Sequence, residues 1–105
     1  IHVSDKIQGY ILNLVRATRQ MAADESSEQY YLSYGASPRA SLSLYQASRA
    51  LAWLRGHDHV TPSIVQEVFL DSMRHRVGLT YEAEAEEITA DDVLKIILDR
   101  TRLPV

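Results

Sequence analysis

The segment Gly35-Ala36-Ser37-Pro38-Arg39-Ala40 constrains the fold most, because it opens the longest helical pattern of the chain. Ser37 belongs to the residue types that cap helix N-termini. Pro38 follows at the first helical position, where a missing N–H costs nothing because that group would have had no partner. The pattern predicts a helix from Pro38 to about Arg55, with Gly56 as its C-terminal stop.

Arg39 then falls in the first helical turn, among free backbone N–H groups and at the positive end of the helix dipole. A cation at such a place is mildly unfavourable, by roughly 0.3–1 kcal/mol. A bound anion would reverse the balance, because helix N-termini are natural phosphate sites. We therefore take Arg39 as the best candidate for a phosphate-binding residue. The alternative is an ordinary surface arginine.

Three further helices are predicted from caps and apolar periodicity. The first begins after Ser4 and ends near Met21, with an apolar stripe at helical spacing formed by Ile7, Tyr10, Ile11, Leu14 and Val15. Polar side chains on its other faces, Arg19 among them, are expected to be solvated. A third helix covers about Pro62 to Met73, because Thr61-Pro62 repeats the order of cap and proline. Thr89 caps the last helix, with an acid close to the position of a capping box, and its pattern ends at Pro104.

The helix predicted over 38–55 is apolar on two sides. One side carries Leu44, Ala47, Leu51 and Leu54, and the other carries Leu42, Tyr45, Ala52 and Trp53. A helix of this kind is usually packed on by several neighbours, so we expect it to be the central one.

The connecting segments lack helical periodicity. Residues 23–28 predict an exposed loop, and residues 30–34, which are rich in tyrosine, predict an extended segment. We favour packing of this aromatic segment on the helix that follows over a role as a docking strip. The acidic segment Glu82–Glu87 is expected to be a solvated connector, with binding of a divalent ion or a basic partner as the alternative. The fold class is therefore all-α, a small bundle of about four helices with a short extended aromatic segment before the central helix.

Composition sets further limits. A chain of 105 residues is one domain by length, and it has no cysteine for a disulfide or a thiolate metal site. The net charge of −3 argues against non-specific binding of nucleic acid. Nine of the eleven basic residues are arginine, which suits paired contacts with carboxylates or phosphates but is equally explained by genome bias. No segment has the length of a membrane span, and no signal peptide or initiator Met is present. We expect a piece of a longer protein.

Other candidate sites are weaker. His57-Asp58-His59 could supply metal ligands, but no further ligands are apparent and a solvated turn is the better interpretation, so no metal site is predicted. His75-Arg76 is expected to support the C-terminal dipole of the third helix. The sequence has no phosphate-binding glycine loop, no dinucleotide fingerprint and no nucleophile elbow. The chain by itself therefore has no catalytic apparatus that we can identify.

Several segments together resemble the C-terminal lid of MoxR-type AAA+ ATPases, with the lid of the magnesium chelatase ATPase subunit as a related possibility. The resemblance covers nearly the whole chain, and it rests on residues 14–19, residues 34–40, Ala50 to Gly56, Val60-Thr61-Pro62, His75-Arg76 and residues 89–93, in the order that the family has them. The segment Gly-Ala-Ser-Pro-Arg-Ala is its most specific part.

The resemblance implies a helical lid that follows an α/β domain with Walker motifs and closes over ATP and Mg²⁺ bound there. It implies that Arg39 is the sensor-2 arginine, which reaches the γ-phosphate, with Ala36, Ser37 and Pro38 beside the nucleotide. It also implies a cytoplasmic, hexameric homo-oligomeric ring that acts as a chaperone in protein maturation. Its partners would be neighbouring subunits and a client with a von Willebrand factor A domain.

The chain departs from the full family pattern because it has no Walker motifs, sensor 1 or arginine finger. We therefore expect residues 1–105 to fold as a single lid domain, and to be monomeric without binding or hydrolysing ATP. The intact parent would be the ATPase. A stand-alone helical interaction module is the alternative function. A helix-turn-helix DNA-binding domain is disfavoured by the acidic charge and the largely apolar third helix.

Overall fold

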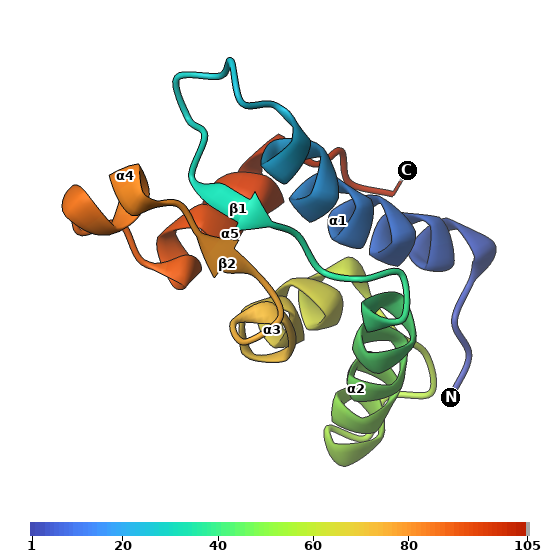
Figure 1. Ribbon diagram of the computed structural model, residues 1–105. Helices are drawn as coiled ribbons and strands as arrows, with labels where there is room; N and C mark the ends of the chain where they lie inside the picture. Colours follow the sequence, from blue (N-terminus) through green and yellow to red (C-terminus); the bar gives the residue numbers. More distant parts are fainter. Residues whose placement is uncertain (105) are drawn as a thin grey trace.

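The helices in the computed structural model, which describes residues 1–104, largely follow the caps that the sequence offers (Figure 1). Within this range the elements are α1 (Asp5–Ala23), β1 (Leu32–Tyr34), α2 (Ala40–Leu54), α3 (Pro62–Met73), β2 (Gly78–Leu79), α4 (Tyr81–Ala85) and α5 (Ala90–Arg100). The all-α prediction is confirmed, with two short strands in addition. The molecule is elongated, with extents of 43 × 22 × 22 Å.

Side-chain oxygens close the starts of the predicted helices α1, α3 and α5. The Ser4 hydroxyl accepts a hydrogen bond from the Ile7 backbone N–H at 3.2 Å. Thr61 does the same for α3 at 3.3 Å, and Thr89 forms a complete capping box with Asp92, with distances of 3.1 and 3.0 Å. Such caps satisfy backbone donors that otherwise lack partners. Among the residues that the structure describes, no helix is long and apolar enough to cross a membrane.

The central helix is α1, not α2. Helix α1 contacts β1, α2, α3 and α5, and its predicted apolar stripe is fully confirmed as buried. Helix α2 buries a single stripe made of Ala40, Leu44, Ser48 and Ala52. Tyr45 and Leu51 are partly buried against the core, whereas Leu42, Trp53 and Leu54 are open to solvent, with exposed fractions of 55%, 70% and 72%. The prediction that the helix over 38–55 is the central one is wrong. Apolar periodicity shows that a helix face favours burial, but it does not show whether another part of this chain covers that face.

The aromatic segment is a strand, but it does not pack as predicted. Strand β1 pairs antiparallel with β2, with Leu32 opposite Leu79 and Tyr34 opposite Gly78, and it lies against α1 rather than on α2 (Figure 1). The ring of Tyr34 covers Gly78, where an added Cβ would collide with it. Gly78 therefore lets an aromatic side chain lie flat across the two strands.

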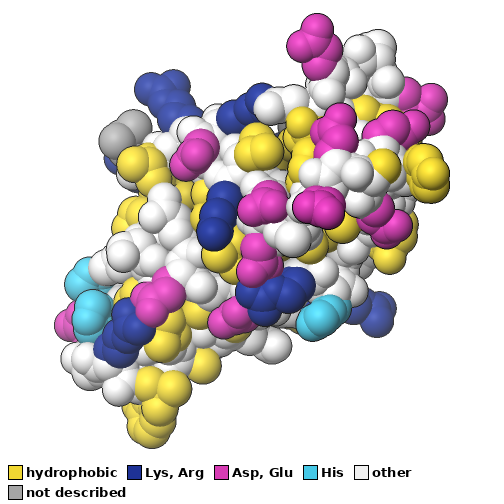
Figure 2. Space-filling model, turned by 90° about the vertical axis from the view of Figure 1, so that its left-hand side faces the viewer, with side chains coloured by type: hydrophobic (Ala, Val, Ile, Leu, Met, Phe, Trp, Pro, Cys, Tyr) yellow, Lys and Arg dark blue, Asp and Glu magenta, His cyan; other side chains and the backbone are white. Residues whose placement is uncertain are grey.

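The predicted acidic connector contains the one-turn helix α4, which the sequence analysis missed. The Thr80 hydroxyl caps α4 by accepting a hydrogen bond from the Ala83 N–H at 3.1 Å, and Ala83 is fully buried. The glutamates at 82, 84, 86 and 87 remain exposed, as expected of a solvated segment. Figure 2, which faces the side on which α4 lies, shows acidic side chains gathered there.

The C-terminal end of α2 is confirmed at Gly56. Gly56 has a φ of +75°, and its N–H donates to the Trp53 carbonyl at 3.0 Å. The His57 N–H donates to the Ala52 carbonyl at 2.9 Å, so the helix ends in a Schellman motif. Glycine adopts this left-handed conformation without a steric cost.

Ion pairs fix α3 against its neighbours. Arg74, which follows α3, donates to both carboxylate oxygens of Asp91 on α5, at 2.7 and 2.9 Å. On the other side, Arg55 forms a two-pronged contact with Glu67 of α3. The hydrogen bonds from Arg74 lower the pKa of the Asp91 carboxyl below its ordinary value.

Acid should weaken the contact between α3 and α5. Because the pKa of Asp91 is lower in the folded chain, the unfolded chain binds more protons than the folded chain as the pH falls. The stabilising contribution of Asp91 is therefore lost progressively as the pH falls toward and through the folded-state pKa. We expect the free energy of unfolding of the wild type to fall more steeply below about pH 4.5 than that of Asp91→Asn. Urea unfolding at several pH values measures this. Glu84→Gln, which removes an exposed carboxylate, should keep the wild-type slope, and equal slopes for all three proteins would contradict the account.

Candidate functional site

The candidate site begins with a close approach between two backbones. Gly35 leaves β1 and lies directly against α1, where a Cβ would be 2.5 Å from the backbone nitrogen of Arg19 and 2.5 Å from the carbonyl carbon of Thr18. Both of these atoms are backbone, so they cannot move aside as a flexible side chain would. Only glycine allows the chain to reach α1 at this point.

Two side chains of α1 then hold the next residue, Ala36. The Thr18 hydroxyl accepts a hydrogen bond from the Ala36 N–H at 2.9 Å and donates its own hydrogen to the Val15 carbonyl at 2.6 Å. The Arg19 guanidinium donates to the Ala36 carbonyl at 3.2 Å. We call these contacts, with the close approach of Gly35, the Thr18–Ala36 clamp. The clamp fixes the point at which the chain, after β1, lies against α1. It also fixes the direction in which the chain enters α2.

Arg19 was expected to be solvated, and that prediction is wrong, since the side chain is half-buried and bonded to Ala36. The buried hydroxyl of Thr18 was also missed. A signal for it exists, because Thr18 continues the buried stripe of α1 through Ile11, Leu14 and Val15. A polar side chain on such a stripe needs a hydrogen-bond partner inside the protein.

The start of α2 differs from the prediction. The helix begins at Ala40, and residues 37–40 form a turn in which the Ala40 N–H donates to the Ser37 carbonyl at 2.9 Å. The Ser41 N–H bonds the Pro38 carbonyl in the same manner, and no side-chain oxygen caps the helix. Ser37 is therefore not the N-cap. The clamp has already fixed the chain direction, and the tighter turn uses the N–H groups that a capping side chain would have served.

Arg39 occupies the N-cap position of α2, with φ −64° and ψ −23°. Its side chain is exposed, and no hydrogen bond within residues 1–104 uses its guanidinium. The N–H groups of Ser37 and Arg39 also have no partner in the described part of the chain. The N–H groups of residues 40–42 are already bonded, so fewer donors are free than the sequence predicted.

The four predicted site residues lie together but play different parts. Ser37, Pro38 and Arg39 are exposed side by side on the turn. Ala36 is fully buried, and both of its backbone polar groups bond to α1, so its part in this structure is to position the turn. Free N–H donors beside an unpaired guanidinium form an arrangement that suits an anion.

An apolar surface beside Arg39 was not predicted as part of the site. A shallow cavity of about 280 Å³ lies between α1 and α2, lined by Gln8, Ile11, Leu12, Ser41, Leu42 and Tyr45. Leu12 and Leu42 remain 49% and 55% exposed. Leu42 lies three residues after Arg39 and so on the same side of the helix start. The arginine therefore stands at the edge of an uncovered apolar surface.

The histidine candidates lie elsewhere. His57, Asp58 and His59 form an exposed turn in which His59 Nδ1 and a carboxylate oxygen of Asp58 are 2.7 Å apart. Throughout residues 1–104, no three His, Asp or Glu side chains come together in a group that could hold a metal ion. Arg76 donates to the Ser72 carbonyl in the last turn of α3 at 3.2 Å, which agrees with the predicted role at the helix dipole.

A family model described as the AAA lid domain matches residues 24–97. The chain is 42% identical to the chaperone MoxR1 of Mycobacterium tuberculosis over 90% of its own length and 26% of that protein. It is 32% identical to the protein MoxR of Paracoccus denitrificans, over 83% of the chain and 28% of that protein. A solved structure of a candidate ATPase from Cytophaga hutchinsonii superposes with a TM-score of 0.87 and 37% identity, covering 97% of this chain and 31% of that one. The chain thus spans less than a third of each of these proteins.

The Thr18–Ala36 clamp should contribute measurably to stability. In Thr18→Val the Ala36 N–H would be buried without a partner, which costs about 1–3 kcal/mol. We expect the free energy of unfolding in urea to fall by that amount. Thr101→Val is the matched control, because its hydroxyl only donates to a carbonyl of its own helix, at 2.7 Å, and no backbone N–H depends on it. Equal effects of the two substitutions would contradict the clamp.

Proposed function

The chain belongs to the AAA lid domain family, and from that premise we propose that it closes over ATP bound to an upstream α/β domain of a MoxR-type AAA+ ATPase. In this proposal Arg39 is the sensor-2 arginine. The intact protein, not residues 1–105 alone, is the enzyme that hydrolyses ATP.

The observation that carries the proposal is the state of Arg39. The clamp fixes the backbone of its turn against α1, yet the guanidinium has no partner within residues 1–104. Other arginines of the chain, such as Arg55 and Arg74, are engaged in ion pairs. A rigid mount with an unpaired cation suits a residue whose partner lies outside the chain.

The chemistry of phosphate recognition fits the turn. A guanidinium stays charged and offers a planar fork of donors that matches two phosphate oxygens. The unpaired N–H groups of Ser37 and Arg39 also suit an anionic partner such as a phosphate. When bound, ATP would supply the phosphoryl group, and Arg39 would stabilise the charge that develops on its oxygens during transfer. Mg²⁺ would be held by the upstream domain.

The neighbouring apolar surface supports closure on another domain. Leu12, Leu42 and Tyr45 form an uncovered surface beside Arg39, and such a surface is favourable when it is buried against a partner. Closure would bring Arg39 to the phosphates and bury the leucines in one movement. Because the clamp ties the turn to α1, the lid would move as a rigid body and transmit the nucleotide state to its neighbours.

The family resemblance extends the proposal to the assembly. The parent would be a cytoplasmic ring of identical subunits, a hexamer, acting as a chaperone on a client with a von Willebrand factor A domain. A stand-alone interaction module is the second candidate, and the exposed leucines beside α2 favour it as well. Under that alternative, Arg39 has no part in ATP turnover.

Arg39→Ala in the intact parent should slow ATP hydrolysis by at least roughly tenfold, since removing one donor that stabilises developing charge costs about 10²–10³ in kcat at comparable sites. Steady-state turnover at saturating ATP measures this. Arg39→Lys should recover only part of the rate, because it keeps the charge and loses the fork.

In residues 1–105 alone, Arg39→Ala should leave the free energy of unfolding within about 0.5 kcal/mol of the wild type. Lys6→Ala is the control, because it removes an exposed cation of α1 away from the turn that carries Arg39. It should change neither ATP turnover in the parent nor the free energy of unfolding of the domain. Unchanged turnover in the parent, or a large loss of stability in the domain, would mean that Arg39 has no nucleotide role.

A further inference from the structure

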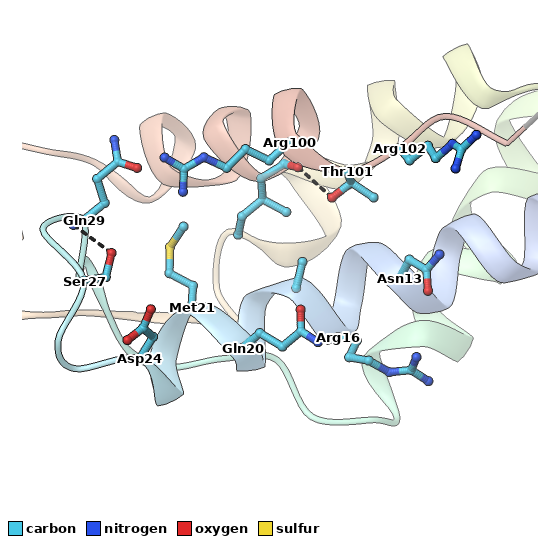
Figure 3. A pocket seen from close by; sticks show the side chains of 12 residues that line it. Asn13, Arg16, Gln20, Met21, Asp24, Ser27, Gln29, Arg100, Thr101 and Arg102 are labelled. Atoms are coloured by element: carbon cyan, nitrogen blue, oxygen red, sulfur yellow. Dashed lines mark hydrogen bonds between the residues drawn. The ribbon is translucent and has the colours of Figure 1, made fainter.

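A second groove lies between the C-terminal halves of α1 and α5. Its volume is about 470 Å³, within the range of ligand pockets. One wall comes from α1, the other from the end of α5 and residues 101 and 102, and the α1–β1 loop closes one end (Figure 3). The apolar surface within it is formed by Ala17, Met21 and Ile97. None of the residues proposed to meet ATP lines this groove.

Most of the arginines whose guanidinium groups contact no other group of the chain line this groove. Five of the nine arginines contact other groups of the chain: Arg19, Arg49, Arg55, Arg74 and Arg76. The guanidinium groups of the other four donate no hydrogen bond within residues 1–104, and three of these residues, Arg16, Arg100 and Arg102, line this one groove. The fourth is Arg39. Because the chain carries fourteen acidic residues, three unpaired arginines at one place mark a surface that favours an anionic partner.

The arginines are spread along the groove rather than gathered at a point. Figure 3 shows the guanidinium of Arg100 toward the end nearest Gln29, whereas Arg16 and Arg102 lie toward the other end on opposite walls. This spread suits a ligand with separated negative groups better than a single phosphate.

The uncharged lining indicates a peptide. Asn13, Gln20 and Gln29 bring side-chain amides to the groove, and an amide can donate to and accept from a peptide group. Among the residues that line the groove none is aromatic, so the bases of a single-stranded nucleic acid would have nothing to stack on.

We propose that this groove binds an acidic peptide segment of a partner protein, with Arg16, Arg100 and Arg102 pairing with its carboxylates. The amides of the lining would hold its backbone, and its apolar side chains would rest on Ala17 and Met21. The site is independent of Arg39 and would serve to engage a protein partner whatever the nucleotide state of the parent.

Fluorescence anisotropy of the 105-residue chain with a labelled peptide of alternating glutamate and alanine tests the proposal, beside a matched peptide in which glutamine replaces each glutamate. We expect saturable binding of the acidic peptide, weakened by salt, and none of its glutamine counterpart. Arg16→Gln with Arg100→Gln should raise Kd by roughly tenfold. Arg49→Gln and Arg39→Gln, outside the groove, should leave Kd unchanged, and thermal melting would show that all variants are folded.

Each other outcome overturns the proposal. Equal binding of the two peptides would remove the role of charge, and an equal loss in the Arg49→Gln control would remove the role of the groove. Full displacement by millimolar inorganic phosphate would indicate a simple anion site. Tighter binding of a single-stranded oligonucleotide, or no binding of the acidic peptide, would also contradict it. Because Arg39 is a control here, failure of this proposal leaves the ATPase proposal untouched.

Discussion

The arrangement of this domain depends on the Thr18–Ala36 clamp. Gly35 brings one backbone against another, Thr18 and Arg19 bond both polar groups of Ala36, and the turn that carries Arg39 follows at once. The clamp adds directional hydrogen bonds to the apolar packing that already places β1 and α2 against α1. With the clamp, the position of an exposed arginine is set by the core of the domain rather than by a mobile loop.

Arginine has three different uses in the chain. Some arginines hold elements together, as Arg74 does between α3 and α5, and Arg19 holds the clamp. Arg39 stands alone beside an apolar surface, and three others line a groove between α1 and α5. Unpaired charge next to exposed apolar surface is expected of a domain that binds partners, since neither the charge nor the apolar surface stabilises the domain by itself. A lid that moves against a larger domain has that character.

The sequence was sufficient for features that depend on local chemistry. Caps at Ser4, Thr61 and Thr89 and the stop at Gly56 are determined by neighbouring residues, and the structure has them where they were predicted. The start of α2 was predicted two residues early, because a contact with Thr18, eighteen residues upstream of Ala36, controls the chain there. The uncovered side of α2 could not be told from a buried one, because periodicity does not show whether the rest of the chain covers a face, and within residues 1–104 this face is exposed. For the candidate site, Arg39 could be proposed from spacing and resemblance, whereas the Thr18–Ala36 clamp and the apolar surface beside Arg39 required the tertiary fold.

The most direct test of the central claim is the coding sequence immediately upstream of Ile1. The account predicts a strand, a Gly-x-x-x-x-Gly-Lys-Ser/Thr loop and a helix there, followed by an acidic strand end, because Arg39 needs a phosphate held by another domain. An upstream region without a phosphate-binding loop would leave Arg39 with no nucleotide to meet. The apolar surface beside α2 would then be the binding surface of an interaction module, and the lid proposal would be wrong.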